Sequence, residues 1–410
     1  MKIYFKTFGC RTNIYDTEIM KKYANSTTTN DENEADIIIV NSCSVTNGAD
    51  SDTRAYIRHI KRLGKKVLLT GCGALSQGQN LLNQNLVDGV FTPSKKSEIS
   101  KFLTKEGKFF ENGDINFQEN EIVSNFENHS KAFIKIQEGC DFNCSYCIIP
   151  QLRGKSRSID ENLILQEAKN LVQNGFNEII LTGTNIGSYG KNNNTTLGKL
   201  LAKLGKINGI KLIRLGSIEP SQIDESFKEI LDESWLEKHL HIALQHTSQK
   251  MLAIMKRRNK AFKDLELFCE LSNKGFALGT DFIVAHPGES EEIWEEAVEN
   301  FKKFPLTHLH SFIYSPRNNT FSATLKQEID GKTAKARMKI LKNIVLLNNY
   351  NFRQKKQNLF INIERKNGEF YEGYDQFYNK NYIKSEKNLT KKIVEVKNYD
   401  IKFEANFAEI

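Results

Sequence analysis

The sequence predicts an α/β protein with an N-terminal parallel α/β domain, a central partial (βα)6 barrel and a small C-terminal all-β barrel. Over roughly the first 330 residues, short apolar runs bounded by turn residues alternate with polar stretches of helical pattern, which is typical of parallel sheets covered by helices. Residues 357–410 instead contain short strand-like segments without a helical pattern. A chain of 410 residues has room for two or three such domains.

Residues 1–125 form the first predicted domain, and three of its apolar runs end in cysteine. KIYFKTFGC, ADIIIVNSC and KKVLLTGC each predict a buried strand, and they close on Cys10, Cys43 and Cys72. Because parallel sheets bind ligands beyond the carboxyl ends of their strands, we expect the three thiols to meet at one edge. Taken singly, each cysteine could equally be a small buried apolar residue. A polar stretch around ENGDINFQENE follows as a linker.

Residues 127–356 form the second predicted domain, which repeats the strand–helix pattern. Its strands are expected at AFIKIQ, EIILTGT, IKLIRLGS, HLHIALQ, DFIVAHP and HLHSFIYS. Six units predict a partial or open barrel, because a closed barrel of this kind needs eight. The domain ends in residues 331–356, which contain eight Lys or Arg and no Asp or Glu. The apolar residues of this segment suit a helix with one buried face.

Residues 357–410 form the third predicted domain, a small all-β barrel. It contains nine basic and nine acidic residues, so its net charge is zero and it offers no charge-driven clamp for phosphates. Its aromatic side chains could stack on unpaired bases or pack in its own core. They include Phe370, Tyr371, Tyr374, Phe377, Tyr378 and Tyr382.

The composition limits the classes of function. The formal charge of +8 permits a polyanionic partner without requiring one. Seven cysteines are too few for a disulfide scaffold, and their odd number argues against full pairing. The N-terminal residues read as a strand and not as a signal peptide, and no run of about 18 apolar residues occurs. We therefore expect reduced thiols in a cytoplasmic protein.

The segment GCDFNCSYC contains Cys140, Cys144 and Cys147 in the spacing C-x3-C-x2-C, directly after a predicted strand. Three thiolates on a 4Fe–4S cluster leave one iron without a protein ligand, and that iron can bind a small molecule. A zinc knuckle is the alternative, but no Cys or His follows at knuckle spacing. The remaining cysteine, Cys269, lies on the apolar face of a predicted helix and is expected in the core.

Ordered motifs along nearly the whole chain resemble the radical S-adenosylmethionine (SAM) methylthiotransferase family. They are TFGCRTNIYDTE, NSCSVTNGAD, TGCGALSQ, GCDFNCSYCIIPQLRGKSRS, LTGTNIGSYG, RLGSIEP, HIALQHTSQKMLAIMKRRN, DFIVAHPGES and SFIYSPRNNTFSA. The C-terminal residues resemble the TRAM RNA-binding module. NSCSVTNGADSDTRAYIR, LTGTNIGSYG and CIIPQLRGKSRS are most similar to the branch that modifies threonylcarbamoyladenosine in tRNA, the MtaB type.

The resemblance implies two [4Fe–4S] clusters, with SAM as both radical source and methyl donor. Cys140, Cys144 and Cys147 would hold the cluster that cleaves SAM, and Cys10, Cys43 and Cys72 an auxiliary cluster that carries sulfur. The product would be 2-methylthio-N6-threonylcarbamoyladenosine at position 37 of tRNA, next to the anticodon. The C2 carbon of adenine is not activated for acid–base chemistry, so a radical is needed to remove its hydrogen. The implied SAM contacts are Tyr146, Thr182, Gly183, Asn185, Ser217, Glu219 and Gln245.

The implied partners are a tRNA anticodon stem-loop, an electron donor of the flavodoxin or ferredoxin type, and a source of sulfide or persulfide. The RNA-binding candidates are Arg153, Lys155, Arg157, Arg257, Arg258, Lys339, Lys342 and Arg353. Departures from the family pattern place His246 and His286 near the expected SAM site, where we expect packing or local hydrogen bonds and no side-chain acid or base.

Two kinds of alternative stay open at the level of sequence. One is the same chemistry on isopentenyladenosine in tRNA or on an aspartate of a ribosomal protein. The other is a non-catalytic RNA-binding protein whose cysteines hold zinc.

Overall fold

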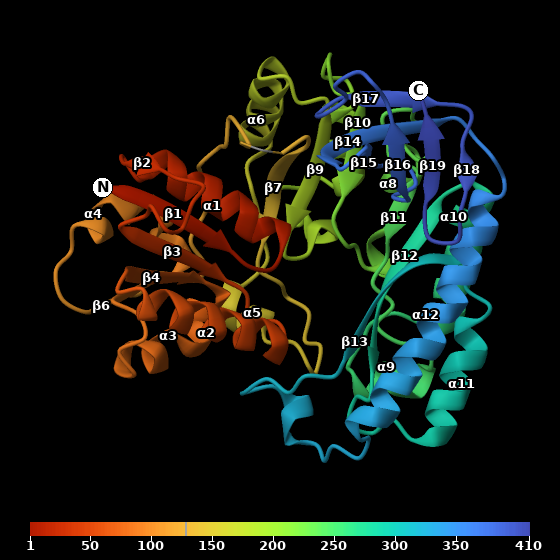
Figure 1. Cartoon of the computed structure of the whole chain (residues 1–410). Coiled ribbons are helices and arrows are strands. Elements are labelled where there is room, and N and C mark those ends of the chain that lie inside the picture. Colours follow the sequence, from red (N-terminus) through yellow and green to blue (C-terminus); the bar gives the residue numbers. More distant parts are fainter. Residues whose placement is uncertain (128) are drawn as a thin grey trace.

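The computed structural model describes residues 1–127 and 129–410. Its chain runs through an N-terminal α/β part, a central set of parallel strands with outer helices, and a C-terminal antiparallel sheet (Figure 1). The fold class expected from the sequence is therefore confirmed. Among the described residues, no helix combines the length and apolar character needed to cross a membrane.

The N-terminal part is built on a six-stranded parallel sheet in the order β2-β1-β3-β4-β5-β6. The three strands expected from the cysteine-terminated runs form its centre. β5 and β6 add to one edge and the two-residue β2 to the other. The strands are β1 (Lys2–Thr7), β2 (Thr27–Thr28), β3 (Ile37–Ser42), β4 (Lys66–Gly71), β5 (Gly89–Phe91) and β6 (Phe109–Glu111), and the helices are α1 (Arg11–Tyr23), α2 (Asn47–Arg62), α3 (Cys72–Asn83), η1 (Pro93–Glu98) and α4 (Ile99–Leu103).

The central part contains the six expected parallel strands and a short antiparallel strand, β8, and they form two sheets in the orders β10-β9-β7-β8 and β11-β12-β13. Isolated bridges join the two sheets, at Ile213 with Leu236 and at Ile218 with Ile242, so the strands form one open curved wall. The strands are β7 (Ala132–Glu138), β8 (Arg157–Ser158), β9 (Glu178–Gly183), β10 (Leu212–Leu215), β11 (His239–His241), β12 (Ala277–Val284) and β13 (Leu306–Ile313).

Helices cover the outside of this wall, and the predicted basic segment forms the last of them (Figure 1). α12 buries Leu341 and Val345 against the barrel while most of its basic side chains stay exposed. The helices are α5 (Ile149–Arg153), α6 (Glu161–Gln173), η2 (Ile186–Ser188), α7 (Leu197–Leu204), η3 (Pro220–Gln222), α8 (Glu225–Lys228), α9 (Gln249–Ile254), α10 (Ala261–Asn273), α11 (Glu291–Phe301), η4 (Phe321–Thr324) and α12 (Gly331–Arg353).

The C-terminal part is a curled six-stranded sheet in the order β17-β14-β15-β16-β19-β18, consistent with a TRAM-like half-barrel. Its pairings are antiparallel except for β16 with β19. Its core takes Tyr371 and Phe377 from the expected aromatic set. The strands are β14 (Leu359–Asn367), β15 (Phe370–Tyr374), β16 (Lys380–Lys384), β17 (Ile393–Val396), β18 (Asp400–Ile401) and β19 (Asn406–Glu409).

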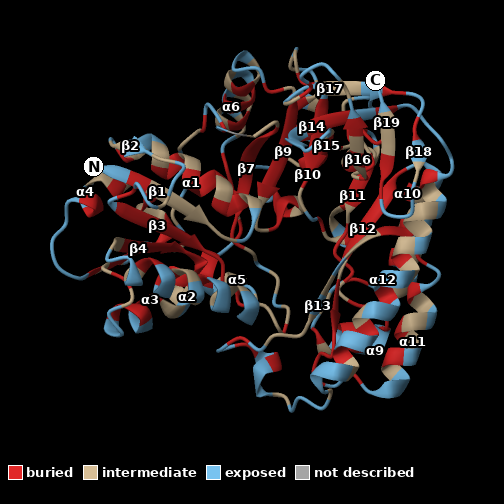
Figure 2. Cartoon of the chain, in the orientation of Figure 1, coloured by how far each residue is buried: buried red, intermediate tan, exposed pale blue. Residues whose placement is uncertain are grey.

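The N-terminal part and the barrel share a hydrophobic core (Figure 2). Tyr15 and Ile19 of α1 are fully buried among barrel side chains such as Phe133 of β7. One expectation for the core was wrong: Cys269 is exposed, because its position on α10 turns away from the buried Phe268 and Leu271.

Candidate functional site

Three cysteines meet at the carboxyl edge of the N-terminal sheet. Cys10 caps α1 after β1, Cys43 follows β3, and Cys72 begins α3 after β4. Burial raises the pKa of the Cys43 thiol to about 11, and the neighbouring Cys72 and Cys10 disfavour its ionisation further. The three thiols are therefore close enough to interact, as parallel strands that end at one edge require.

Gly9 permits this approach of the three loops. Its φ of +90° lies in the left-handed region, which residues with a side chain rarely adopt. A Cβ atom at this position would lie 2.4 Å from the Cβ of Cys43. A glycine before Cys10 is thus needed for the first cysteine loop to pack against the second.

The other three cysteines lie in the loop after β7, at the mouth of the barrel. Burial raises the pKa of Cys147 to about 12, and Cys144 and Cys140 raise it further. The Phe142 N–H points at the Cys140 sulfur over 3.4 Å, and Asn185 Nδ2 lies 3.6 Å from the same atom. The loop therefore brings three sulfurs together, and N–H donors of Phe142 and Asn185 lie near the sulfur of Cys140.

The donor chemistry of both sets fits iron–sulfur clusters. Cys43 and Cys72 are buried, Cys140, Cys144 and Cys147 are partly buried, and Cys10 is exposed. In a buried setting the ionised thiols that bind metal are costly without a cation. Each set also has an arginine close to one sulfur: Arg153 Nε lies 3.4 Å from Cys72 Sγ, and an Arg257 guanidinium nitrogen lies 3.7 Å from Cys144 Sγ. Such donors stabilise thiolate charge and tune a cluster's potential.

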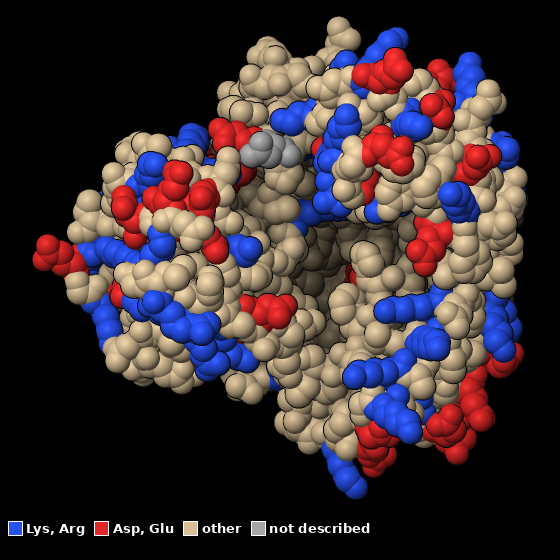
Figure 3. Space-filling model, in the orientation of Figure 1, with Lys and Arg blue, Asp and Glu red and all other residues tan. Residues whose placement is uncertain are grey.

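A cavity of about 330 Å³ lies at the mouth of the barrel, against the N-terminal part. Cys140, Cys144 and Cys147 line it from the barrel, and Val45 and Thr46, which follow Cys43, line it from the N-terminal part. The space-filling view shows a deep hollow between the N-terminal part and the barrel, with Lys and Arg on both sides of it (Figure 3). One cysteine set therefore lines the cavity directly, and the other lies next to residues that line it.

Most of the sequence-predicted SAM contacts line this cavity. They are Tyr146, Asn185, Ser217, Glu219 and Gln245. Two others do not line it: the Thr182 hydroxyl lies 3.4 Å from the Thr12 hydroxyl, and Gly183 packs closely on the backbone of Gln137. These two residues join the N-terminal part to the barrel and pack β9 on β7, and contact with SAM stays a prediction for them.

Gln245 has a strained backbone, with a φ of +65°. Hydrogen bonds to the backbone of β12 hold it there, since its N–H donates to Asp281 and its carbonyl accepts from Ile283, both over 2.9 Å. A non-glycine residue held in this region is uncommon and typical of functional sites. In this backbone conformation Gln245 lines the cavity.

Arg257 lines the cavity, and its side chain does not face solvent. Its side chain is 2% exposed and donates through two nitrogens to the Glu219 carboxylate and also to the carbonyl of Ala243. The prediction that Arg257 binds RNA was therefore wrong in this structure, because its donors are taken up inside the protein. Glu219 therefore binds Arg257 and also lines the cavity.

Arg153 is likewise buried, with 4% exposure, in contrast to its predicted contact with RNA phosphate. It pairs with Asp16 over 3.0 Å and with Glu138 over 2.6 Å, and its third nitrogen donates to Asn13 over 2.7 Å. Lys135 pairs with the same two carboxylates. Arg153 therefore belongs to a buried charge network between the N-terminal sheet and the barrel.

The remaining RNA-binding candidates divide by exposure. Arg157 is mostly buried and donates to backbone carbonyls, and Arg353 is 5% exposed and donates to the C-terminal strand region. Neither has a free guanidinium for phosphate. Four candidates are exposed and stay predictions: Lys155, Arg258, Lys339 and Lys342.

The two histidines of the departing motifs are buried and locally bonded, as expected. His286 contacts the Pro287 carbonyl and the Ser322 hydroxyl, each over 2.8 Å. His246 accepts from the Ser248 N–H over 3.1 Å. Burial lowers the pKa of both imidazoles.

Sequence reasoning missed Asp281 as a residue that lines the cavity. Asp281 lies inside a strand and not at its end, so the rule that places ligands at strand ends does not select it. Arg317 reaches the N-terminal part, where it pairs with Asp50 over a sequence separation of 267 residues. Only the three-dimensional fold brings such a pair together.

Two segments of the chain match known protein families. Residues 2–92 match the uncharacterized protein family UPF0004, and residues 134–301 match the radical SAM superfamily. A protein of Helicobacter pylori named "Putative methylthiotransferase" is 46% identical over 99% of both chains. The chain belongs to the radical SAM methylthiotransferase family. The cofactors of this family are SAM and two [4Fe–4S] clusters.

Other radical SAM methylthiotransferases are less similar. The threonylcarbamoyladenosine tRNA methylthiotransferase MtaB of Aquifex aeolicus is 37% identical, over 84% of this chain and 88% of its own. The tRNA-2-methylthio-N(6)-dimethylallyladenosine synthase of Sulfurimonas denitrificans is 31% identical, over 97% and 93%. The methyltransferase TsrM of Kitasatospora setae shares the fold alone, with a TM-score of 0.57 at 14% identity over 77% and 74% of the two chains.

Proposed function

We propose that this radical SAM methylthiotransferase adds a methylthio group to C2 of N6-threonylcarbamoyladenosine at position 37 of tRNA. The observation that carries the chemistry is a cavity that Cys140, Cys144 and Cys147 line from the barrel and that Val45 and Thr46, just after Cys43, line from the N-terminal part. A reaction that needs a radical at carbon and a sulfur donor at the same carbon requires this arrangement, because the two must act on one bound base.

The choice of substrate is supported by the relatives and by motifs. The MtaB enzymes of Aquifex aeolicus, Rickettsia prowazekii and Bacillus subtilis are 37%, 34% and 31% identical to the chain, and three dimethylallyladenosine synthases are 31% to 32% identical. The segment NSCSVTNGADSDTRAYIR also resembles the MtaB type. Methylthiolation of isopentenyladenosine is the second candidate within this family.

The chain's own residues hold and orient the reactants. Cys140, Cys144 and Cys147 would hold one cluster, and Cys10, Cys43 and Cys72 the other. With these groups bound, reductive cleavage of SAM supplies a 5′-deoxyadenosyl radical, and sulfur methylated by a second SAM supplies the methylthio group. The chain's residues have two further tasks.

The first task is orientation and the second is exclusion of water. Tyr146, Asn185, Ser217 and Gln245 converge on the cavity and can fix the position of SAM and of the base. Apolar lining from Ile218, Ile283 and Phe312 restricts water around the reacting carbon. No side chain is assigned as a general acid or base, because a radical abstracts the C2 hydrogen as an atom.

For the RNA we propose contact around the rim of the hollow. The exposed candidates are Lys155, Arg258, Lys339 and Lys342, and the strand module adds aromatic surface without net charge. An anticodon stem-loop presents splayed bases between phosphates, which suits a mixture of basic and aromatic contacts. The reaction also needs a reductant of the flavodoxin or ferredoxin type and a sulfide or persulfide source.

The decisive experiment is mass spectrometry of tRNA nucleosides from a strain that lacks this gene. Threonylcarbamoyladenosine should accumulate without its 2-methylthio group, and the wild-type gene should restore the modification. Cys72→Ala and Cys147→Ala should each fail to restore it. Cys269→Ala is the matched control, because this cysteine is exposed and lies outside both sets. If only the isopentenyladenosine product is lost, the choice of substrate is wrong.

A separate measurement tests the chemistry. Anaerobically purified protein should contain iron and acid-labile sulfide in equal amounts, as two 4Fe–4S clusters require. Zinc bound to sulfur in place of iron would refute the enzymatic proposal and favour a structural RNA-binding protein.

A further inference from the structure

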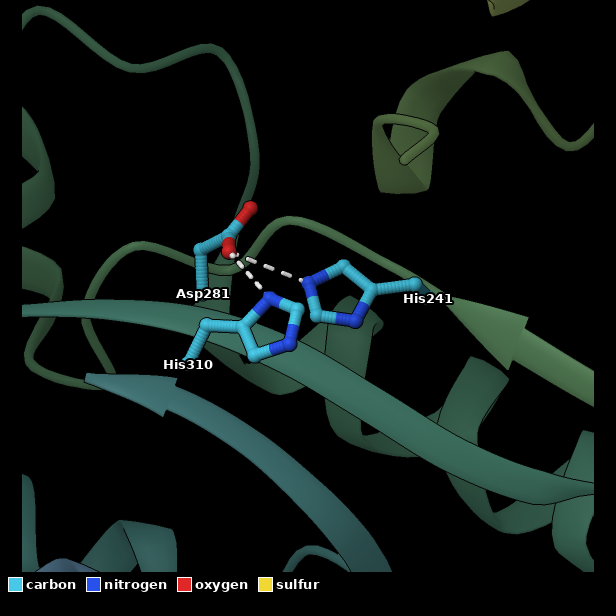
Figure 4. A group of neighbouring side chains, drawn as sticks. All are labelled: His241, Asp281 and His310. Atoms are coloured by element: carbon cyan, nitrogen blue, oxygen red, sulfur yellow. Dashed lines mark ion pairs between the residues drawn. The ribbon is translucent and has the colours of Figure 1, made fainter. Parts of the chain in front are cut away.

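Three neighbouring strands place two histidines and an aspartate on one side of the barrel wall, beside the cavity. His241 ends β11, Asp281 lies in β12 and His310 lies in β13, and Asp281 is the direct register partner of His310. The three side chains point toward one another in the close-up view (Figure 4). None of them has a role in the function proposed above.

Gly279 makes the convergence possible. It is the register partner of His241 and lies two residues before Asp281 on the same face of β12. A Cβ atom at Gly279 would lie 2.7 Å from His241 Nδ1. The absence of a side chain at Gly279 leaves room for the His241 ring, whose other nitrogen lies near Asp281.

The ligand atoms have the spacing of a metal site. His241 Nε2 lies 3.1 Å and His310 Nδ1 lies 3.5 Å from the same carboxylate oxygen, Oδ1 of Asp281. Two atoms that each lie about 2.05 Å from a tetrahedral ion are about 3.3 Å apart. All three ligand atoms lie within 4.8 Å of one another.

The orientation of His241 favours a shared ion over a hydrogen bond. Its Nε2 is buried and has no hydrogen-bond partner, although Asp281 Oδ1 is only 3.1 Å away. An imidazole nitrogen carries either a hydrogen or a lone pair in the same direction. Since this direction does not point at Asp281 Oδ1, a lone pair on Nε2 would point beside the oxygen. That is the direction in which an ion bound to both atoms would lie.

The surroundings of Asp281 agree with this reading. The other oxygen of Asp281 lies 3.4 Å from the Ser217 hydroxyl, which leaves Oδ1 for the histidines. Two imidazoles and one carboxylate are a ligand set typical of divalent first-row metals such as Zn²⁺, Fe²⁺ and Mn²⁺.

We propose that His241, Asp281 and His310 bind a divalent first-row metal ion at the edge of the reaction cavity. Three protein ligands leave at least one coordination position open. Because Asp281 and Ser217 both line the cavity, that position lies next to the cavity. An oxygen atom of a bound substrate can complete the coordination.

The test uses Zn²⁺ as the probe on the anaerobically reconstituted holoenzyme. Bound zinc and iron are counted by mass spectrometry after desalting from buffered zinc, and absorbance of the clusters checks that they stay intact. We expect one zinc per chain in addition to the full iron content. His310→Gln should weaken binding at least tenfold, and so should Asp281→Asn. His310→Gln should not disturb folding, because the His310 side chain is 62% exposed.

His59→Gln is the matched control, since His59 also lies near a carboxylate, 3.8 Å from Glu32, but on an exposed surface. This variant should bind zinc like the wild type. X-ray absorption at the zinc edge identifies the ligands, with nitrogen or oxygen expected at about 2.0–2.2 Å and sulfur at about 2.3 Å. Sulfur ligands, or equal zinc binding by wild type and His310→Gln, would overturn the proposal. Neither result depends on the choice of RNA substrate.

Discussion

Replacing Arg153 by methionine should destabilise the junction between the N-terminal sheet and the barrel. Arg153 follows the radical SAM cysteine loop, yet it contacts Cys72, Asp16 and Asn13 of the other part. Methionine keeps a comparable chain length and removes the charge. The substitution leaves Asp16 and Glu138 buried with one cation fewer.

The size of the effect follows from the charges in the network. Loss of Arg153 removes its ion pairs with the carboxylates of Asp16 and Glu138. The network contains four cations and three carboxylates, namely Lys96, Lys135, Arg153, Arg157, Asp16, Glu119 and Glu138. Breaking a buried pair from one side costs about 3–5 kcal/mol. With about 2.1 cal/mol/K of unfolding entropy per residue, a chain of 410 residues loses about 4–6 °C in Tm.

The assay is thermal unfolding of the cluster-loaded protein at pH 7, followed by circular dichroism. Arg153→Lys is the matched variant, because it keeps the charge and should recover at least half of the lost Tm. Arg58→Met, on an exposed position of α2, should change Tm by less than about 1 °C. Equal Tm values for wild type and Arg153→Met would refute the view that this network joins the two parts.

Three further predictions concern separate parts of the molecule. Cys147→Ala should remove about half of the iron and leave the auxiliary cluster detectable by electron paramagnetic resonance after reduction; complete loss of iron would contradict two independent sites. Burial raises the pKa of Glu167 to about 8, so its contribution to stability is present below about pH 4.5 and is lost as the pH rises through 8. Glu167→Gln should therefore raise Tm at pH 8.5 and leave it nearly unchanged at pH 5, and a uniform change at both pH values would contradict this. Tyr378 stacks on His239 at 5.1 Å and accepts from Arg11 over 3.3 Å, so Tyr378→Ala should speed proteolytic release of the C-terminal strand module, with exposed Phe360→Ala as the control.

Much of the fold could be predicted because its strands are long apolar runs that end in recognisable turns. The six barrel strands and the three cysteine-terminated strands were all found in this way. The two-residue β2 was missed, since Thr27 and Thr28 are exposed and carry no apolar signal. The short β5 and β6 were missed too, because three residues are too few to show a period.

The cysteine sites could be predicted because their signals are local, while the charged residues around them could not be placed. The sequence around an arginine in a basic loop does not indicate whether its partner is a phosphate or a buried carboxylate. Arg153 pairs with Asp16, which lies 137 residues away in the sequence, and Arg257 pairs with Glu219, which lies 38 residues away. Burial of a charge depends on such distant partners, so the RNA-binding prediction failed at the residues whose partners lie inside the protein.

The buried charge network also explains how two cysteine sets on separate sheets can be held in a fixed arrangement. Asp16 lies one and a half turns after Cys10 on α1, and it pairs with Lys135 of β7, the strand that leads to Cys140. Arg153 follows Cys147 and reaches Cys72. An apolar contact between the two parts would tolerate sliding, whereas hydrogen-bonded ion pairs of 2.6–3.2 Å constrain both the distance and the direction between their partners. Burying these charges has a desolvation cost. The network nevertheless fixes the separation between the two sets of sulfurs, which the proposed reaction requires because both sets act on one carbon atom.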